Sequence, residues 1–312
     1  MPYIVRRLLA TIPVMTVVAV VVFMLLRLTT GDPAAIIAGD SATAQDVAAI
    51  RNRLGLDRPI AEQFILWIGK VVRGDFGESF FFKKPVAELI VGRLQPTLAL
   101  ATCTLVLAVS MAVPLGVFAA WRRGTWIDRG VMGLSVMGFS VPTFVIGYVL
   151  IYLVAIQLGW LPVQGYQRLE EGFGGFVQRL ILPSFTLSVI YVALIARITR
   201  ASVLEVLNAD HVRTARAKGL GDLTVLLRHV LRNAAVPIVT VIGLGVALLI
   251  GGVVVTESVY AIPGLGRLTV DAVLARDYPT VQAVILLFSM VYVFINLLVD
   301  LTYTVLDPRI RY

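Results

Sequence analysis

The chain of 312 residues has a single cysteine, Cys103, and only two histidines, His211 and His229. One cysteine excludes a disulfide within the chain and a thiolate-based metal site. Cys103 sits in an apolar run, where a small buried side chain is the expected role. Both histidines fall in one basic loop with no nucleophile and base around them, so we expect no catalytic residue and no metal ligand.

Charge is also scarce. Lys, Arg, Asp and Glu make up 15% of the chain, 58% is hydrophobic, and the mean hydropathy is +0.89. A soluble domain has about 25% charged and about 45–50% apolar residues. One core cannot bury this excess of apolar residues, so lipid must cover part of it. The net charge of +8 then fits loops rich in Lys and Arg on the cytoplasmic side of a membrane. No soluble basic domain is present to bind nucleic acid.

Six apolar runs are long enough to cross the hydrocarbon core, which takes about 20 residues of helix. They cover residues 8–27, 96–121, 130–157, 181–200, 233–257 and 280–305. The first run is too long for the core of a signal peptide, which has about 7–15 residues, so we expect a retained anchor. The sequence therefore predicts an all-α integral membrane protein with six transmembrane helices.

Lys and Arg near the ends of the runs indicate the orientation. They gather at the N-terminus, after the second and fourth runs, and in the tail: Arg6, Arg7, Arg122, Arg123, Arg129, Arg200, Arg213, Arg216, Lys218, Arg228, Arg232, Arg309 and Arg311. With six spans these positions all lie on one side, which must be the cytoplasm. We therefore expect a multi-pass protein with both termini in the cytoplasm.

The segment of residues 28–95 is the one extramembrane part with the content of a domain. Apolar residues recur there at helical spacing, at Ile60, Phe64, Trp67, Ile68 and Val71. We expect short extracytoplasmic helices packed on the outer membrane surface. Three phenylalanines at 80–82, followed by two lysines, fit an interfacial anchor or a patch that docks a partner.

These features divide the chain into four parts. Residues 1–27 form the cytoplasmic N-terminus and the first span, and residues 28–95 form the extracytoplasmic segment. A five-helix core covers residues 96–305 and includes a cytoplasmic loop at 200–232. A cytoplasmic tail covers residues 306–312.

The chain also lacks its own energy source. It has no Gly-rich loop ending in Gly-Lys-Ser/Thr to hold a nucleotide, and no ladder of carboxylates for an ion relay. Within the spans we note Glu257 near the outer end of the fifth and Asp300 near the inner end of the sixth. Glu257 either serves a pathway or gate or sits at an interface. Asp300 either does the same or pairs with an arginine such as Arg309.

Proline and glycine mark further candidate positions for a hinge or pathway. Pro142 interrupts the third run, and Gly251 and Gly252 are adjacent in the fifth. Such residues permit kinks and close helix approach in membranes. Ordinary helix packing remains the alternative for each of them.

The loop at 200–232 has the pattern helix, turn, helix. Asn208 or Asp210 is a candidate N-cap, Gly219 is a candidate C′ glycine with positive φ, and Asp222 is a candidate N-cap of a second helix that continues into the fifth span. Small and apolar residues share one face, and cations surround it at Arg213, Arg216, Lys218 and Arg228. From the residues alone, this loop either docks an acidic partner or lies on anionic headgroups.

Ordered motifs along the chain carry a resemblance to a known family. They include Gly31-Asp32-Pro33, Leu54-Gly55-Leu56-Asp57-Arg58-Pro59, Gly74-Asp75-Phe76-Gly77-Glu78-Ser79, Leu158-Gly159-Trp160-Leu161-Pro162, Arg213-Thr214-Ala215-Arg216-Ala217-Lys218-Gly219-Leu220, Pro263-Gly264-Leu265-Gly266-Arg267 and Asp307-Pro308-Arg309. The chain resembles the first permease subunit of ABC importers of the dipeptide, oligopeptide and nickel family. Arg213-Thr214-Ala215 replaces the general Glu-Ala-Ala, and Pro237 lies further along than the usual Leu-Pro.

The resemblance implies a subunit of the bacterial inner membrane that forms half of a translocation pathway. Its partners would be a second permease, two cytoplasmic ATPases that bind ATP and Mg²⁺, and an extracytoplasmic solute-binding protein. No cofactor would bind this chain. The loop would be a coupling helix that docks on an ATPase. Its coupling residues, some of which would touch the ATPase while others hold the two short helices together, would be Asp210, Arg213, Thr214, Ala215, Arg216, Lys218, Gly219, Asp222 and Arg228.

Peptides are the substrates that the resemblance favours, with nickel complexes, glutathione and opines as alternatives. A different class stays open from the residues alone, namely an ion-coupled carrier or a membrane scaffold that needs no ATPase.

Overall fold

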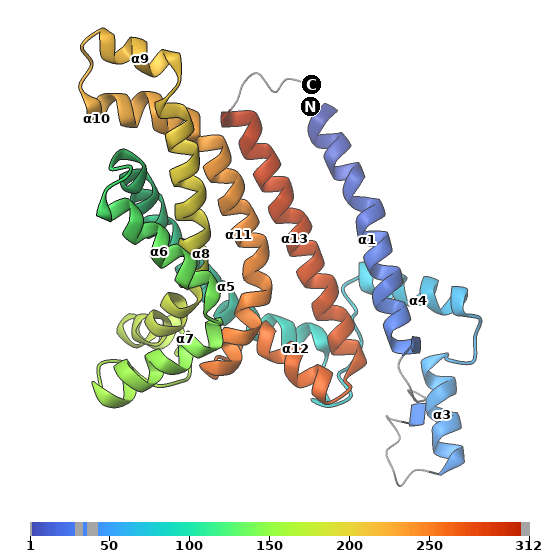
Figure 1. Cartoon of the computed structure of the whole chain (residues 1–312). Helices are drawn as coiled ribbons and strands as arrows, with labels where there is room; N and C mark the ends of the chain where they lie inside the picture. The colour runs from blue at the N-terminus through green and yellow to red at the C-terminus, as the bar shows by residue number, and fades with distance from the viewer. Residues whose placement is uncertain (1, 29–33, 36–42, 307–312) are drawn as a thin grey trace. The chain divides into compact units, whose positions relative to one another are not determined.

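The computed structural model describes residues 2–28, 34–35 and 43–306, and helices make up most of them (Figure 1). The helices are α1 (Pro2–Leu28), α3 (Ala44–Leu54), α4 (Ile60–Val72), α5 (Val86–Trp121), α6 (Trp126–Ser140), α7 (Thr143–Leu150), α8 (Phe173–Leu207), α9 (Asp210–Ala217), α10 (Asp222–Thr224), α11 (Leu231–Val259), α12 (Leu265–Leu274) and α13 (Tyr278–Leu306). π-helical turns follow α7 at Ile151–Gln157 and α10 at Val225–Val230, and a 3₁₀ turn lies at Leu169–Glu171.

The chain forms two compact units. The first comprises Met1–Arg93 with Leu268–Val293, and the second comprises Leu94–Arg267 with Phe294–Tyr312. The motifs at 31–33 and 307–309, and the tail with Arg309, lie outside the described residues.

Among the residues that the structure describes, four helices are long and apolar enough to cross a membrane: Val86–Trp121, Phe173–Leu207, Asp222–Val259 and Tyr278–Thr302. A bent pair of helices, Trp126–Ser140 and Thr143–Gln157, makes a fifth candidate, and α1 carries a shorter apolar stretch at Leu9–Leu25. The chain is therefore a multi-pass helical membrane protein. Because α10, the π-helical turn and α11 form one helix, the predicted continuity of the loop with the fifth span is confirmed.

The predicted run at 130–157 is wrong as one continuous helix. It is broken between α6 and α7 with a bend of 101°. Pro142 is the N-cap of α7 with φ −57°, and the preceding Val141 is extended, with φ −97° and ψ 124°. Proline lacks an amide hydrogen and disfavours helical backbone in the residue before it. The predicted kink at Pro142 is thus confirmed, and it is sharp enough to end one helix and begin another.

The predicted boundary at residue 95 falls inside a helix. α5 begins at Val86, ten residues before the predicted start at 96, and contains Pro96. The first turns of α5 carry Glu88, Arg93 and Gln95. Because these residues are polar, the apolar run in the sequence starts later than the helix does. α8 extends past the predicted 181–200 at both ends for the same reason: its flanking turns are too polar to count as membrane span.

In the first unit, a buried aspartate joins the segment before α5 to the start of α13. Asp277 is fully buried and accepts hydrogen bonds from the Ser79 hydroxyl, from the Phe80 amide at 3.0 Å and from the Thr280 hydroxyl at 2.7 Å. Within this anchored segment, Phe81 remains 60% exposed. The choice between an interfacial anchor and a docking patch for these phenylalanines stays a prediction.

In the second unit, α5 and α8 approach closely at Gly116. A Cβ added there would lie 2.6 Å from the Ala196 carbonyl oxygen and 2.7 Å from the Thr199 Cβ. A Cβ added at Gly92, in the same helix, would meet no other atom within 4 Å. Gly116 therefore sets the spacing of these two helices, in the way small residues commonly do in membranes.

We expect Gly116→Ala to destabilise the protein by about 1–3 kcal/mol, because the added methyl group meets backbone that must shift. Gly92→Ala, the matched control, is expected to be neutral or to stabilise by up to about 1 kcal/mol through helix propensity. Thermal unfolding of the two variants in detergent checks this. Equal unfolding temperatures would contradict the assignment of Gly116 as a contact that fixes helix spacing.

Candidate functional site

The candidate site is the loop that joins α8 to α11, and α9 is its central element. α9 and α10 lie at one end of α8 and α11 (Figure 1). α9 ends in a Schellman turn, in which the Gly219 amide donates to Arg216 at 2.9 Å and the Leu220 amide donates to Ala215 at 3.3 Å. Gly219 has φ +79°, a conformation that side chains other than glycine adopt at a cost. The predicted C′ role of Gly219 is confirmed.

The predicted N-caps of this loop are wrong. Ala209 is the N-cap of α9 and Gly221 that of α10, and neither makes a side-chain capping bond. Asp210 and Asp222 are instead the first residues of their helices. A carboxylate at this position still interacts favourably with the positive end of the helix dipole. The Asn208 side chain donates to Leu204 within α8, so it is not free to cap the next helix.

One face of α9 packs within the chain. Val212 and Ala215 are buried in an apolar cluster with Val203 of α8 and Val225 of the π-helical turn. The cluster also contains Ala120, Leu226, Val230, Ala234 and Ile238. Ala215 is thus the one member of the nine predicted coupling residues that is buried, and the other eight are exposed. Its small side chain lets α9 approach its own chain.

The outward face of α9 is polar and basic. Arg213 lies 3.6 Å from Asp210, and Arg216 lies 3.5 Å from Asp222, both pairs being exposed. Such exposed pairs contribute little stability, so the arginines stay available to a partner. Beside them, Leu220 is 40% and Leu223 is 63% exposed. These two leucines were not among the residues predicted from the sequence, although apolar residues three apart in a polar loop could have indicated them.

An ion pair joins α8 to α6 below this loop. Arg200 donates to both carboxylate oxygens of Asp128, through Nε and through Nη2, the latter at 2.8 Å. Asp128 is 5% exposed and also accepts from the Gly124 amide at 3.0 Å. Two-point pairing of guanidinium with carboxylate fixes orientation as well as distance. The pair therefore locks the start of α6 to the part of α8 that leads into α9.

We expect Arg200→Gln to destabilise the protein by on the order of 3 kcal/mol, because it leaves a buried carboxylate without its cation. Arg129→Gln, which removes an exposed arginine one residue from Asp128, serves as the matched control and is expected to change stability little. Combining Asp128→Asn with Arg200→Gln is expected to recover part of the loss. Thermal unfolding of the three variants measures these differences; no recovery in the double variant would contradict direct coupling.

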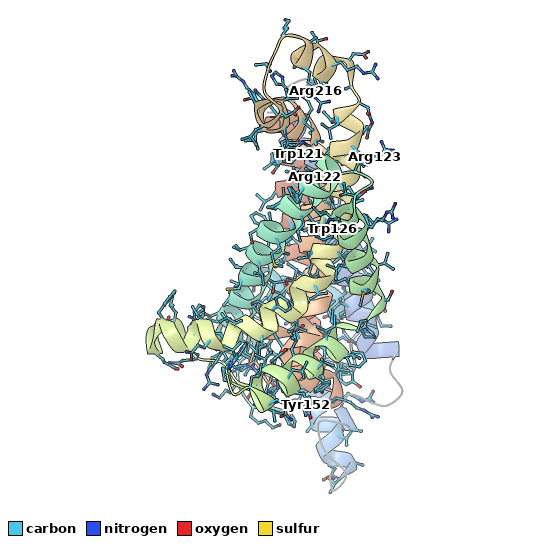
Figure 2. The ribbon with its side chains drawn as sticks, turned by 60° about the vertical axis from the view of Figure 1, so that its left-hand side comes forward. Trp121, Arg122, Arg123, Trp126, Tyr152 and Arg216 are labelled. Carbon is cyan, nitrogen blue, oxygen red and sulfur yellow. The ribbon has the colours of Figure 1, made fainter. Side chains whose placement is uncertain are left out.

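This end of the second unit is basic and aromatic. Figure 2 shows Trp121, Arg122, Arg123 and Trp126 towards the end where Arg216 lies, with Tyr152 near the opposite end. Trp126 is 81% exposed, and the Arg122 guanidinium lies 5.6 Å from the centre of the Trp121 ring. Tryptophan with arginine at a helix end is typical of the boundary between membrane and water.

The structure places Glu257 in a closed polar cluster. Its side chain is fully buried and accepts from the Thr97 hydroxyl at 2.6 Å and from the Arg267 amide at 3.0 Å. Thr97 in turn accepts from the Leu265 amide at 2.7 Å. A Cβ on Gly264 would lie 2.1 Å from the carboxylate. Glu257 thus holds the turn between α11 and α12 against α5, and its role in a gate stays a prediction.

The remaining pathway candidates occupy different surroundings. Gly252 lies against α8, where an added Cβ would be 2.7 Å from Leu187 and 3.1 Å from the Tyr191 hydroxyl, whereas Gly251 faces open space. Pro142 is exposed at the bend and Asp300 is half-buried in α13. The geometry gives Gly252 a packing role, and for the other three a place in the pathway stays a prediction.

The comparisons with known proteins agree along the whole chain. Residues 112–312 match the family described as the binding-protein-dependent transport system inner membrane component, and residues 1–101 match the N-terminal part of such membrane components. The chain is 55% identical over 310 residues to "Probable peptide ABC transporter permease protein y4tP" of Sinorhizobium fredii, covering 99% of both chains. It is 46% identical to the glutathione transport system permease protein GsiC of Escherichia coli K12, again covering 99% of both.

A solved structure shares the fold. The MetNI methionine ABC transporter has a chain with a TM-score of 0.59 and 19% identity, and the match covers 70% of this chain and 96% of that one. The sequence matches decide against an ion-coupled carrier or a scaffold. The protein belongs to the inner-membrane components of binding-protein-dependent transport systems and is an ABC transporter permease subunit of the dipeptide and oligopeptide type.

Proposed function

We propose that this chain is one of two permease subunits of an ATP-driven importer for peptides, and that α9 is the helix that docks on a cytoplasmic ATPase. The observation that carries the docking assignment is the two-sided α9. Its apolar face is buried through Val212 and Ala215, and its basic face is exposed through Arg213 and Arg216. A loop that only lay on lipid headgroups would not need an apolar cluster to hold its helix rigidly against the rest of the chain, whereas a docking helix would.

The same packing supports a coupling mechanism. α9 contacts α8 and the start of the helix Asp222–Val259 through one buried cluster, and the Asp128–Arg200 pair joins α8 to α6. A displacement of α9 would therefore move these helices as packed bodies, because close-packed interfaces shift between discrete arrangements. ATP and Mg²⁺ would bind the two ATPases, and this chain would bind no cofactor.

For the membrane topology we propose six spans, with α1 as the first and the α6–α7 pair as the third. The basic end with Arg122, Arg123 and α9 then faces the cytoplasm together with both termini. Glu257 and the α11–α12 turn lie toward the outer side, where a solute-binding protein would deliver substrate. Pro142 and Gly251 are the positions that we assign to the moving part of the pathway.

Peptide is the substrate we assign, on the strength of the named peptide permease at 55% identity. Glutathione, itself a tripeptide, is the second candidate because of the 46% identity to GsiC. Nickel complexes and opines remain more distant alternatives. Uptake of labelled dipeptide, pentapeptide and glutathione by vesicles that hold the complete transporter decides between them.

The assembly itself is tested by co-purification. A tagged chain should retain a nucleotide-binding protein and a second permease after mild detergent extraction. Arg213→Glu should weaken retention of the nucleotide-binding protein and leave the second permease in place. Retention that is unchanged by Arg213→Glu, together with unchanged uptake, would remove α9 as the docking helix.

A further inference from the structure

Helix α4, in the first unit, has an apolar face that packs on α1 and α13. Phe64, Trp67, Ile68 and Val71 lie against a cluster that contains Ala19, Val22 and Leu286. The Phe23 ring of α1 lies 5.2 Å from the Phe64 ring and 5.5 Å from the Trp67 ring. This face is accounted for by contacts within the chain.

A second apolar flank of α4 has no cover among the residues that the structure describes. Ile65 is 66% exposed and Val72 is 81% exposed, and Ala61 is exposed on the same side. At about 100° per residue these three positions fall within roughly 40° of one another, beside the packed face. The exposed charges Glu62, Lys70 and Arg73 lie roughly 60–140° around the helix from this flank. A helix in water would carry polar residues on such a flank.

The contacts of α4 also give its depth. Arg27 is the first charged residue after the long apolar run of α1, and Phe23, Val22 and Ala19 lie four, five and eight residues before it. At about 1.5 Å per residue, α4 touches α1 roughly 6–12 Å along the helix from Arg27, inside the apolar run. The Gln282 side chain donates to the Val22 carbonyl at 3.0 Å, which holds α13 at the same level. A helix at this depth lies below the boundary with water.

From these placements we propose that α4 is an interfacial membrane helix, set into the outer leaflet, with lipid acyl chains covering Ala61, Ile65 and Val72. On α1 itself, Val17, Val21 and Leu25 are 63%, 53% and 41% exposed, so this helix also presents apolar side chains that lipid would cover. The opposite charges, Glu62 and Arg73, then meet the headgroups, as in helices that lie in the interface plane.

This inference rests on the proposed topology, in which α1 is a span and residues 28–95 are extracytoplasmic. It places α4 deeper than a helix packed on the outer surface. An amphipathic helix that is fixed to α1 and α13 at the level of the lipid boundary also resists vertical sliding of these two helices, so α4 would hold them at a constant depth.

The test uses fluorescent labels on single cysteines in the complete transporter. Cys103→Ala removes the native cysteine, and Ile65→Cys, Val72→Cys, Glu62→Cys and Arg73→Cys are labelled one at a time and reconstituted into phosphatidylcholine vesicles. We expect nitroxide on the acyl chains to quench the labels at 65 and 72 several-fold more than aqueous iodide does. The labels at 62 and 73 should show the reverse.

Two outcomes overturn the inference. Iodide that quenches positions 65 and 62 equally would place the flank in water. Protection of positions 65 and 72 from both quenchers would mean that protein, such as the second permease or the solute-binding protein, covers the flank. Val17→Cys separates this inference from the topology on which it rests: loss of acyl-chain quenching at 17 removes α1 as a span, whereas quenching at 17 without quenching at 65 removes only the inference.

Discussion

Replacing Gly219 with valine is expected to lower ATP-dependent uptake by about tenfold or more while membrane insertion stays intact. Gly219 ends α9 with φ +79°. A left-handed conformation costs a residue with a Cβ about 1–2 kcal/mol, and a β-branched residue more. About 1.4 kcal/mol corresponds to a factor of ten in the population of the correct loop conformation. Because the space around Gly219 is open, the effect comes from the backbone and not from a clash within the chain.

Gly221 provides the matched control for this experiment. It lies in the same loop with open space around it, and its φ is −63°, which any residue adopts. Gly221→Val should therefore leave uptake within about twofold of the unchanged protein, as expected for surface changes away from special backbone positions. Equal losses in the Gly219 and Gly221 variants would mean that bulk in the loop matters and that the turn of α9 does not.

Removing the carboxylate of Glu257 is the second change from which we expect a large effect. Glu257→Ala would remove the carboxylate to which the buried Thr97 hydroxyl and the partly buried Arg267 amide donate, and would open a cavity beside Gly264. Each buried polar group without a partner costs about 1–3 kcal/mol. We therefore expect a loss of stability on the order of 3 kcal/mol, with little correctly folded protein recovered from membranes.

Two further variants identify the cause of that loss. Glu257→Gln preserves the shape and one acceptor, so it should recover an intermediate stability. Glu205→Ala removes an exposed glutamate and should have almost no effect. Thermal unfolding and uptake of the purified transporter give the comparison. If Glu257→Ala unfolds normally but transports nothing, Glu257 acts on the pathway directly and not through the turn that it holds.

Local chemistry explains what could be predicted from the sequence. The helix break at Pro142 follows from the missing amide hydrogen of proline, and the turn at Gly219 follows from the freedom of glycine. The apolar spacing at Ile60, Phe64, Trp67, Ile68 and Val71 predicted α4 because helical periodicity repeats within a few residues. Such features depend on neighbours in the sequence and need no knowledge of the fold.

The errors arose where tertiary contacts decide. Asp210 and Asp222 are good capping residues, yet Ala209 and Gly221 hold those positions. We attribute this to the buried cluster around Val212 and Ala215, which sets the phase of α9. The first turns of α5 are likewise helical although they are polar, so the helix begins before the apolar run that predicted it.

No pattern in the sequence indicated that Asp128 and Arg200 form an ion pair. Its members are 72 residues apart, and Asp128 lies among exposed arginines with which it could equally have paired. The close approach at Gly116 was hidden for a similar reason, since many glycines in this chain lie in helices and only their neighbours in space distinguish Gly116 from Gly92. Contacts between distant segments carry no local pattern.

Crosslinking from α9 tests the central claim most directly. A photoreactive amino acid is placed at position 213 of α9 in the complete transporter, in native membranes, and the products are identified by mass. We predict one main product that joins this chain to a nucleotide-binding subunit, with a yield that changes when ATP is added. A product with lipid alone, or none with the nucleotide-binding subunit in either condition, would contradict the assignment of α9 as the coupling helix.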